Sequence, residues 1–132
     1  MAQPIELILV RHLAGRLALP TFLVDADGRL VFYNEAAEPI LGRRFDEAGE
    51  MAFEDWTSVF AVRDERDQLV DVDQIPLARA LLTRRPVHVR VAITGLDGSP
   101  RALEVSAFPL EGQGAQLLGA VALFWESAIE EG

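Results

Sequence analysis

LLGAVALFW, at residues 117–125, decides the fold, because every side chain in this stretch is apolar. A strand without a polar face has to be covered on both sides, so the stretch is predicted to be the central strand of a sheet. It is too short to span a membrane as a helix, and the preceding Gly112 and Gly114 are typical of a turn. The rest of the chain must therefore supply a cover for each face of this strand.

Alternation along the strand predicts which of its side chains share a face. The face that carries Val121 and Leu123 is expected to point into the main core. The opposite face has small residues at its middle, so we expect the apolar segment 4–17 to pack closely on it as a helix. The strand residues predicted for this helix contact are Leu118, Ala120 and Phe124.

Composition narrows the class of protein. The 132 residues correspond to one domain, and the absence of cysteine excludes disulfides and thiolate chemistry. With 21 acidic residues against 12 arginines, the net charge of −9 argues against nucleic acid as a partner. No basic region precedes the apolar N-terminal stretch, so we expect a cytoplasmic protein with no membrane partner.

The N-terminal segment is apolar around more than one face. Ile5, Leu9 and Leu13 form one stripe that is expected to dock on the sheet, and Pro20 is expected to end the helix near Leu17. Other apolar side chains then point away from the sheet and predict a homodimer through this helix. The residues predicted at these contacts are Ile5, Leu7, Ile8, Val10, Leu118, Ala120 and Phe124.

The remaining elements follow from local signals. Two strand-like runs, 21–26 and 29–33, flank the turn pair Asp27-Gly28 and predict a hairpin. Asn34 is expected to cap a short, bent helix that Gly42 ends. Residues 53–60 predict a short helix with Phe53, Trp56, Val59 and Phe60 on one face, and 75–85 a helix with Leu77, Leu81 and Leu82 inward. Strands are predicted at 87–94 and 102–108, before the central strand.

The inward positions of these elements form the candidate ligand site. Aliphatic and aromatic side chains there either line a cavity or simply fill a core, and the lack of convergent polar groups favours the filled core. His12 and His88 are too few for a metal site, and no acidic pair has a base beside it, so we expect neither a metal nor catalysis. The candidate residues are Val24, Phe53, Trp56, Phe60, Leu77, Leu81, Val91, Ile93, Leu103, Val105, Val121 and Leu123.

The motifs together resemble a PAS domain of bacterial signalling proteins over residues 18–126. The resemblance rests on FLVDADGRLVFYNEAAEPILG at 22–42, PLARALLTRRPV at 76–87, GLDGSPRALEVSAFPL at 95–110 and LLGAVALF at 117–124. It implies an α+β fold whose five-stranded antiparallel sheet has the order 2-1-5-4-3, with helices on one face and the N-terminal helix, residues 1–17, on the other. Residues 127–132 are expected to be a disordered tail, of a free-standing protein or of one cut from a larger chain.

The resemblance also implies a function. PAS modules sense ligands or bind partners in signal transduction and transcription regulation, so we expect a non-enzymatic sensory or interaction module with an unidentified partner protein and a possible small apolar ligand. Flavin photosensors of this family use a cysteine, and haem-binding members a histidine on the helix that corresponds to 75–85; this chain has neither, so no cofactor is expected. The alternative is a small α+β cone protein that binds or isomerises an apolar ligand, similar to ketosteroid isomerase.

Overall fold

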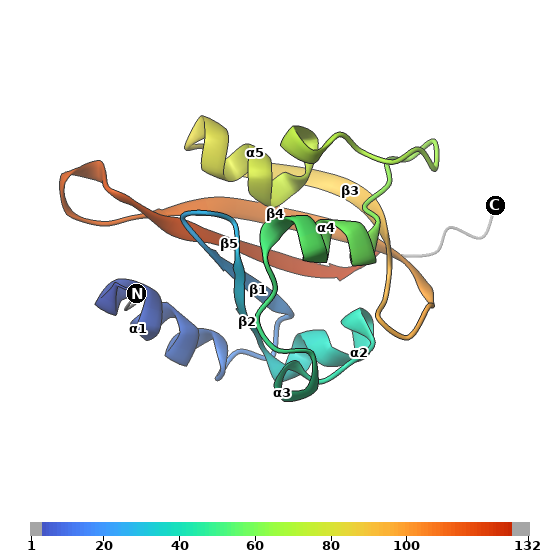
Figure 1. Ribbon diagram of the computed structural model, residues 1–132, viewed down its shortest axis with the longest axis horizontal. Coiled ribbons are helices and arrows are strands. Elements are labelled where there is room, and N and C mark those ends of the chain that lie inside the picture. The colour runs from blue at the N-terminus through green and yellow to red at the C-terminus, as the bar shows by residue number, and fades with distance from the viewer. Residues whose placement is uncertain (1–3, 128–132) are drawn as a thin grey trace.

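Strand β5, Leu117–Glu126, is the central strand of a five-stranded antiparallel sheet, as predicted from its apolar sequence. The computed structural model describes residues 4–127 and gives the strand order β2-β1-β5-β4-β3, which is the order implied by the resemblance (Figure 1). The other strands are β1 Thr21–Asp25, β2 Leu30–Tyr33, β3 Val87–Thr94 and β4 Pro100–Glu111.

Helices cover both faces of this sheet, so the α+β class is confirmed. Helices α4 and α5 lie on one side and α1 on the other (Figure 1). The α-helices are α1 Ile5–Ala14, α2 Glu38–Leu41, α3 Phe45–Ala48, α4 Phe53–Phe60 and α5 Pro76–Thr83, and the 3-10 turns are η1 Glu35–Ala37, η2 Val72–Gln74 and η3 Gln113–Ala115. Within residues 4–127, no helix has the length and apolar character that a membrane crossing requires.

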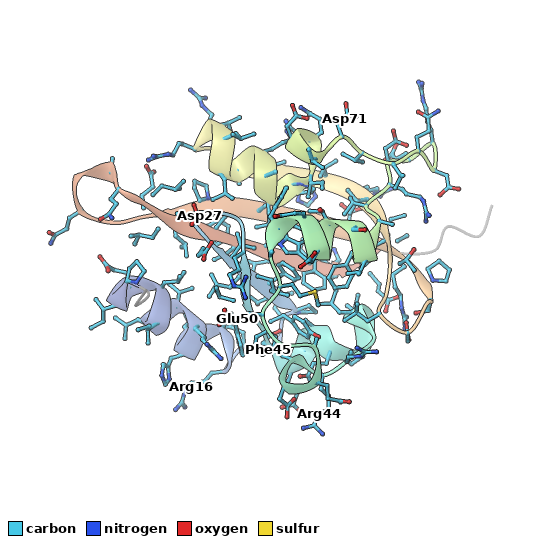
Figure 2. The ribbon with its side chains drawn as sticks, in the orientation of Figure 1. Arg16, Asp27, Arg44, Phe45, Glu50 and Asp71 are labelled. Carbon is cyan, nitrogen blue, oxygen red and sulfur yellow. The ribbon has the colours of Figure 1, made fainter. Side chains whose placement is uncertain are left out.

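The predicted hairpin of β1 and β2 is confirmed, with Asp27 near its tip (Figure 2). Gly28 has a φ of +83°, and a Cβ atom there would lie 2.9 Å from the Phe53 ring. Its carbonyl oxygen accepts a hydrogen bond of 2.8 Å from the indole Nε1 of Trp56. Glycine is therefore required at position 28 for two reasons: the backbone conformation of the turn and the close approach of α4.

The segment after β2 is also close to its prediction. The side chain of Asn34 accepts a hydrogen bond from the Ala37 amide and caps η1, and Gly42 ends α2 with a φ of +86°. Pro39 lies in the first turn of α2, where its missing N–H group costs no helical hydrogen bond. The predicted bend is thus a junction between a 3-10 turn and a short α-helix.

The assignment of the two faces of β5 was wrong. Ala120, Ala122 and Phe124 belong to the main core, the large cluster between the sheet and helices α4 and α5. Val121 and Leu123 instead face α1. Ala122 is the cross-strand neighbour of Phe22 in β1 and lines the same cavity as Trp56 and Phe60 of α4, so aromatic side chains and not α1 fill the space beside the small residues.

The predicted roll of α1 was wrong in the same way. Leu7 is fully buried and forms, with Leu23, Val31 and Val121, the outer cluster between α1 and the sheet. Ile5, Leu9 and Leu13 are exposed, at 69%, 61% and 60%. The stripe of α1 that faces the sheet instead contains Leu7 and Ala14, the two buried residues of the helix. The small Ala14 side chain lies on this buried face, and the charged side chains of the helix lie outside it.

Several smaller predictions also differ from the structure. Val59 and Leu82 were expected to face inward, but both are exposed, Leu82 by 70%. The predicted N-terminal helix stops at Ala14 rather than Leu17, and α3 was not predicted. Of the predicted disordered tail, only Ser127 falls within the described residues, and its amide donates to the Ala102 carbonyl oxygen at 2.9 Å.

Candidate functional site

The main core contains a cavity of about 70 Å³ between the sheet and helices α4 and α5. Only apolar side chains line it. The lining residues are Phe22, Leu41, Trp56, Phe60, Val62, Ile75, Pro76, Leu77, Val91, Ile93, Leu103, Val105, Ala122 and Phe124.

The structure brings most of the candidate ligand-site residues to this cavity or beside it. Those that line it are Trp56, Phe60, Leu77, Val91, Ile93, Leu103 and Val105. Val24, Phe53 and Leu81 pack in the same core without lining the cavity. Val121 and Leu123 lie on the opposite face of the sheet, so their assignment to this site was wrong.

Half of the lining residues were not predicted from the sequence, although two of them, Phe22 and Ala122, had a signal there. Phe22 pairs with Ala122 across β1 and β5, so a correct face for β5 would have placed both residues here. Ala122 in turn pairs with Ala107 of β4. Val62 had no such signal, because it lies in a charged segment that predicts a surface loop.

Aromatic side chains pack against one another along one wall of the cavity. The Phe22 ring lies 5.2 Å from the Trp56 ring and 6.1 Å from the Phe60 ring, both in edge-to-face geometry. On its other side Phe22 stacks on Tyr33, with 6.2 Å between ring centroids. The Tyr33 hydroxyl donates to the Arg43 carbonyl oxygen at 2.8 Å, and burial, followed by the carboxylate of Glu38, raises the pKa of Tyr33 to about 12.

Size and polarity define what this cavity can hold. Trp56 carries the one indole N–H group of the lining, and the Gly28 carbonyl oxygen already accepts its hydrogen bond. Pockets for drug-sized ligands are usually about 300–1,000 Å³, whereas apolar cavities of about 150 Å³ bind benzene or xenon. A cavity of about 70 Å³ therefore suits a very small apolar molecule in this conformation.

The outer edge of the sheet carries an ionic cluster on β3 and β4. The ring Nε2 of His88 lies 3.0 Å from a carboxylate oxygen of Glu104, and Arg90 binds the other oxygen. The Arg90 hydrogen bond is the main cause that lowers the pKa of Glu104 below its usual range. His88 is exposed, and within residues 4–127 no group of three or more His, Asp or Glu side chains could hold a metal ion.

The residues predicted for the dimer fall into three groups. Ile5 and Ile8 are exposed on α1. Leu7 and Val10 instead pack on the chain's own sheet. Of the strand residues, Ala120 and Phe124 lie in the main core and not against α1, and Leu118 is buried beside Gly112.

Comparisons with known proteins identify the family. Residues 16–129 match the family described as the PAS fold, whereas no curated protein matches the chain. The PAS domain of a Colwellia psychrerythraea protein superposes with a TM-score of 0.65 at 14% identity, covering 92% of this chain and 97% of its own. The PAS domain of nitrogen regulation protein NR(II) from Vibrio parahaemolyticus gives 0.62 at 16% identity, covering 90% and 98%, and the LOV protein of Rhodobacter sphaeroides 0.69 at 15%, covering 93% and 68%. The protein belongs to the PAS-fold family.

Proposed function

We propose that this protein is a non-enzymatic sensory and interaction module of bacterial signal transduction or transcription regulation, and that it acts in the cytoplasm as a homodimer. Its signal reaches a partner protein through α1 and the sheet surface. The observation that carries this proposal is the exposed apolar stripe of α1, formed by Ile5, Ile8, Leu9 and Leu13.

The cavity supports a sensor or a structural core over an enzyme. An isomerase of the cone type needs a buried acid and a hydrogen-bond donor aimed at its substrate. The side chains around the cavity include no Asp, Glu or His, and the Trp56 N–H group is already bonded to Gly28. An apolar lining of this kind can bind or exclude a small molecule, but it cannot transfer a proton.

The same lining does not suit a flavin or a haem. Helix α5 has no histidine that could ligate iron, and the chain has no cysteine for a flavin adduct. A cavity of about 70 Å³ is also far smaller than either ring system needs. We expect purified protein to show no visible absorption band, and a stoichiometric flavin or haem spectrum would overturn this part of the proposal.

The α1 stripe is an unusual feature for a chain that remains monomeric. Ile5, Leu9 and Leu13 are each at least 60% exposed, and Ile8 continues the patch toward β2. Contiguous exposed apolar patches commonly mark protein interfaces. Burying these side chains contributes about 1.5–3 kcal/mol each before the cost of association, which is sufficient for a dimer at micromolar concentration.

The test is the mass of the full chain in solution by light scattering after size exclusion. Wild type is expected to have the mass of two chains, and the double variant Leu9→Glu with Leu13→Glu that of one. The matched control is Leu82→Glu on α5, because Leu82 is equally apolar and 70% exposed but lies away from the stripe. A monomeric wild type, or a double variant that remains a dimer, would contradict the proposed interface.

A further inference from the structure

A second concave site lies on the outer side of the molecule, between α1 and β2. It is a groove of about 500 Å³, within the size range of small-ligand sites. Figure 2 labels Arg16, which follows the C-terminal end of α1 and lines this groove. Its lining residues are Ile8, Arg11, His12, Gly15, Arg16 and Phe32.

The charge of this groove is opposite to that of the chain. Arg11, Arg16 and the His12 ring line it together, and no carboxylate does. The whole chain, by contrast, has a net charge of −9. Six of the twelve arginines bind carboxylates of residues 4–127, as Arg29 binds Glu50 at 3.2 Å, whereas Arg11 and Arg16 are among those that form no ion pair with a described residue.

Aromatic rings hold the guanidinium of Arg11 in place. Its central carbon lies 5.0 Å from the centroid of the Phe32 ring and 5.8 Å from that of Phe45. Such cation–π contacts orient the planar group without using its N–H donors. Arg11 is only partly exposed, so its donors are fixed at the groove wall with no hydrogen-bond partner among the described residues.

We propose that this groove binds a small organic anion, in which a carboxylate or phosphate group is attached to an apolar or aromatic part. The anionic group accepts hydrogen bonds from Arg11 and Arg16, and the flat apolar part lies beside Phe32, which is outside the proposed dimer stripe. The fixed Arg11 lowers the entropic cost of binding. This site is separate from the cavity of the main core, and it does not rest on the proposed dimer.

The test uses three probes and the full-length chain. Amide chemical shifts are followed by NMR during titration with phenyl phosphate, with phenol as its neutral match and with inorganic phosphate as its polar part. We expect saturable shifts at Arg11, His12, Gly15, Arg16 and Phe32 with phenyl phosphate, weaker shifts with inorganic phosphate and none there with phenol.

Variants separate binding from general charge effects. Arg11→Met with Arg16→Ala keeps the apolar stem over Phe32 and is expected to weaken phenyl phosphate binding by about tenfold or more, as the loss of one charged hydrogen bond implies. The control Arg66→Ala with Arg85→Ala removes the same two charges at exposed sites outside the groove and is expected to leave binding unchanged. Equal groove shifts with phenol, or undiminished binding by the double variant, would overturn the site.

A separate experiment distinguishes a lipid headgroup from a soluble ligand as the source of the anion. Vesicles of equal parts phosphatidylcholine and phosphatidylglycerol are sedimented with wild type and with the double variant. Arginine-dependent co-sedimentation would identify a lipid headgroup as the anion, and phenyl phosphate binding without co-sedimentation would identify a soluble ligand. If neither probe binds, the arginines only complement the C-terminal end of the α1 dipole, and the proposal is wrong.

Discussion

The side-chain nitrogen Nδ2 of Asn34 lies 2.9 Å from the carbonyl oxygen of Ala14, the last residue of α1. The same nitrogen donates to the Leu19 carbonyl oxygen at 2.9 Å, and Oδ1 accepts from the amides of Thr21 and Ala37 at 3.0 and 3.1 Å. Asn34 is fully buried. One amide group therefore ties the end of α1 and the start of β1 to the cap of η1.

Replacing Asn34 tests this junction. In Asn34→Asp the carboxylate can still accept from Thr21 and Ala37, but it repels the carbonyl oxygens of Ala14 and Leu19. Each buried group left without a partner costs about 1–3 kcal/mol, so we expect a loss on the order of 2–4 kcal/mol of unfolding free energy at neutral pH. Urea unfolding measures the loss.

Asn34→Ala is the comparison variant, because it removes donor and acceptor without adding a charge. Burial beside carbonyl oxygens favours the protonated carboxyl group, so the N34D variant should recover stability relative to N34A as the pH falls. A difference between the two variants that does not depend on pH would show that the Asn34 site is hydrated.

Tyr33 offers a direct measurement, since it is the only tyrosine of the chain. Its tyrosinate absorption in the near ultraviolet is expected to appear with a midpoint about pH 12 in the folded protein and about pH 10 in denaturant. Because the folded-state pKa is raised, the contribution of Tyr33 to stability is complete below pH 10 and is lost as the pH rises through 12. A folded-state midpoint near 10 would mean that the hydroxyl reaches water and not the Arg43 carbonyl.

Local signals in the sequence predicted much of this fold. The pair Asp27-Gly28 favours a tight turn, and the side chain of Asn34 favours the start of a helix directly after it. The apolar run 117–125 needs cover on both faces and therefore predicts a central strand. Each of these predictions depends on a few neighbouring residues, and each is confirmed.

The errors lie where two faces of one element are equally apolar. Val121 and Ala122 both suit a buried position, so alternation separates the two faces of β5 but cannot say which one meets α4. The stripes of α1 that contain Leu7 or Leu9 are ambiguous for the same reason. The basic groove had no signal at all, because tertiary structure alone brings Phe32 beside Arg11.

The cavity predicts opposite effects for the same substitution on the two sides of the sheet. Val91→Ile adds one methylene group next to the cavity and is expected to stabilise the protein by up to about 0.8 kcal/mol. Val121→Ile adds the same group to the closely packed outer cluster, where overpacking costs about 1–3 kcal/mol. Thermal unfolding compares both with wild type. A destabilised V91I variant would indicate that another molecule already fills the cavity.

The last prediction concerns the roll of α1. Leu7 is fully buried against Leu23, Val31 and Val121, so Leu7→Ala is expected to cost about 2–5 kcal/mol. Leu9→Ala removes an exposed side chain from the same helix and should change the stability of one chain by no more than about 0.5 kcal/mol.

Both substitutions are made in an Ile5→Glu with Leu13→Glu background, because Leu9 is also proposed to lie in the dimer interface and two glutamates in the stripe are expected to give a monomer, which removes that contribution. Urea unfolding then measures only the packing of α1 on its own sheet. A larger loss for Leu9→Ala than for Leu7→Ala would restore the helix orientation that the sequence predicted. Negligible losses of unfolding free energy for both substitutions would mean that α1 does not pack on the sheet of its own chain in solution unless a partner is bound.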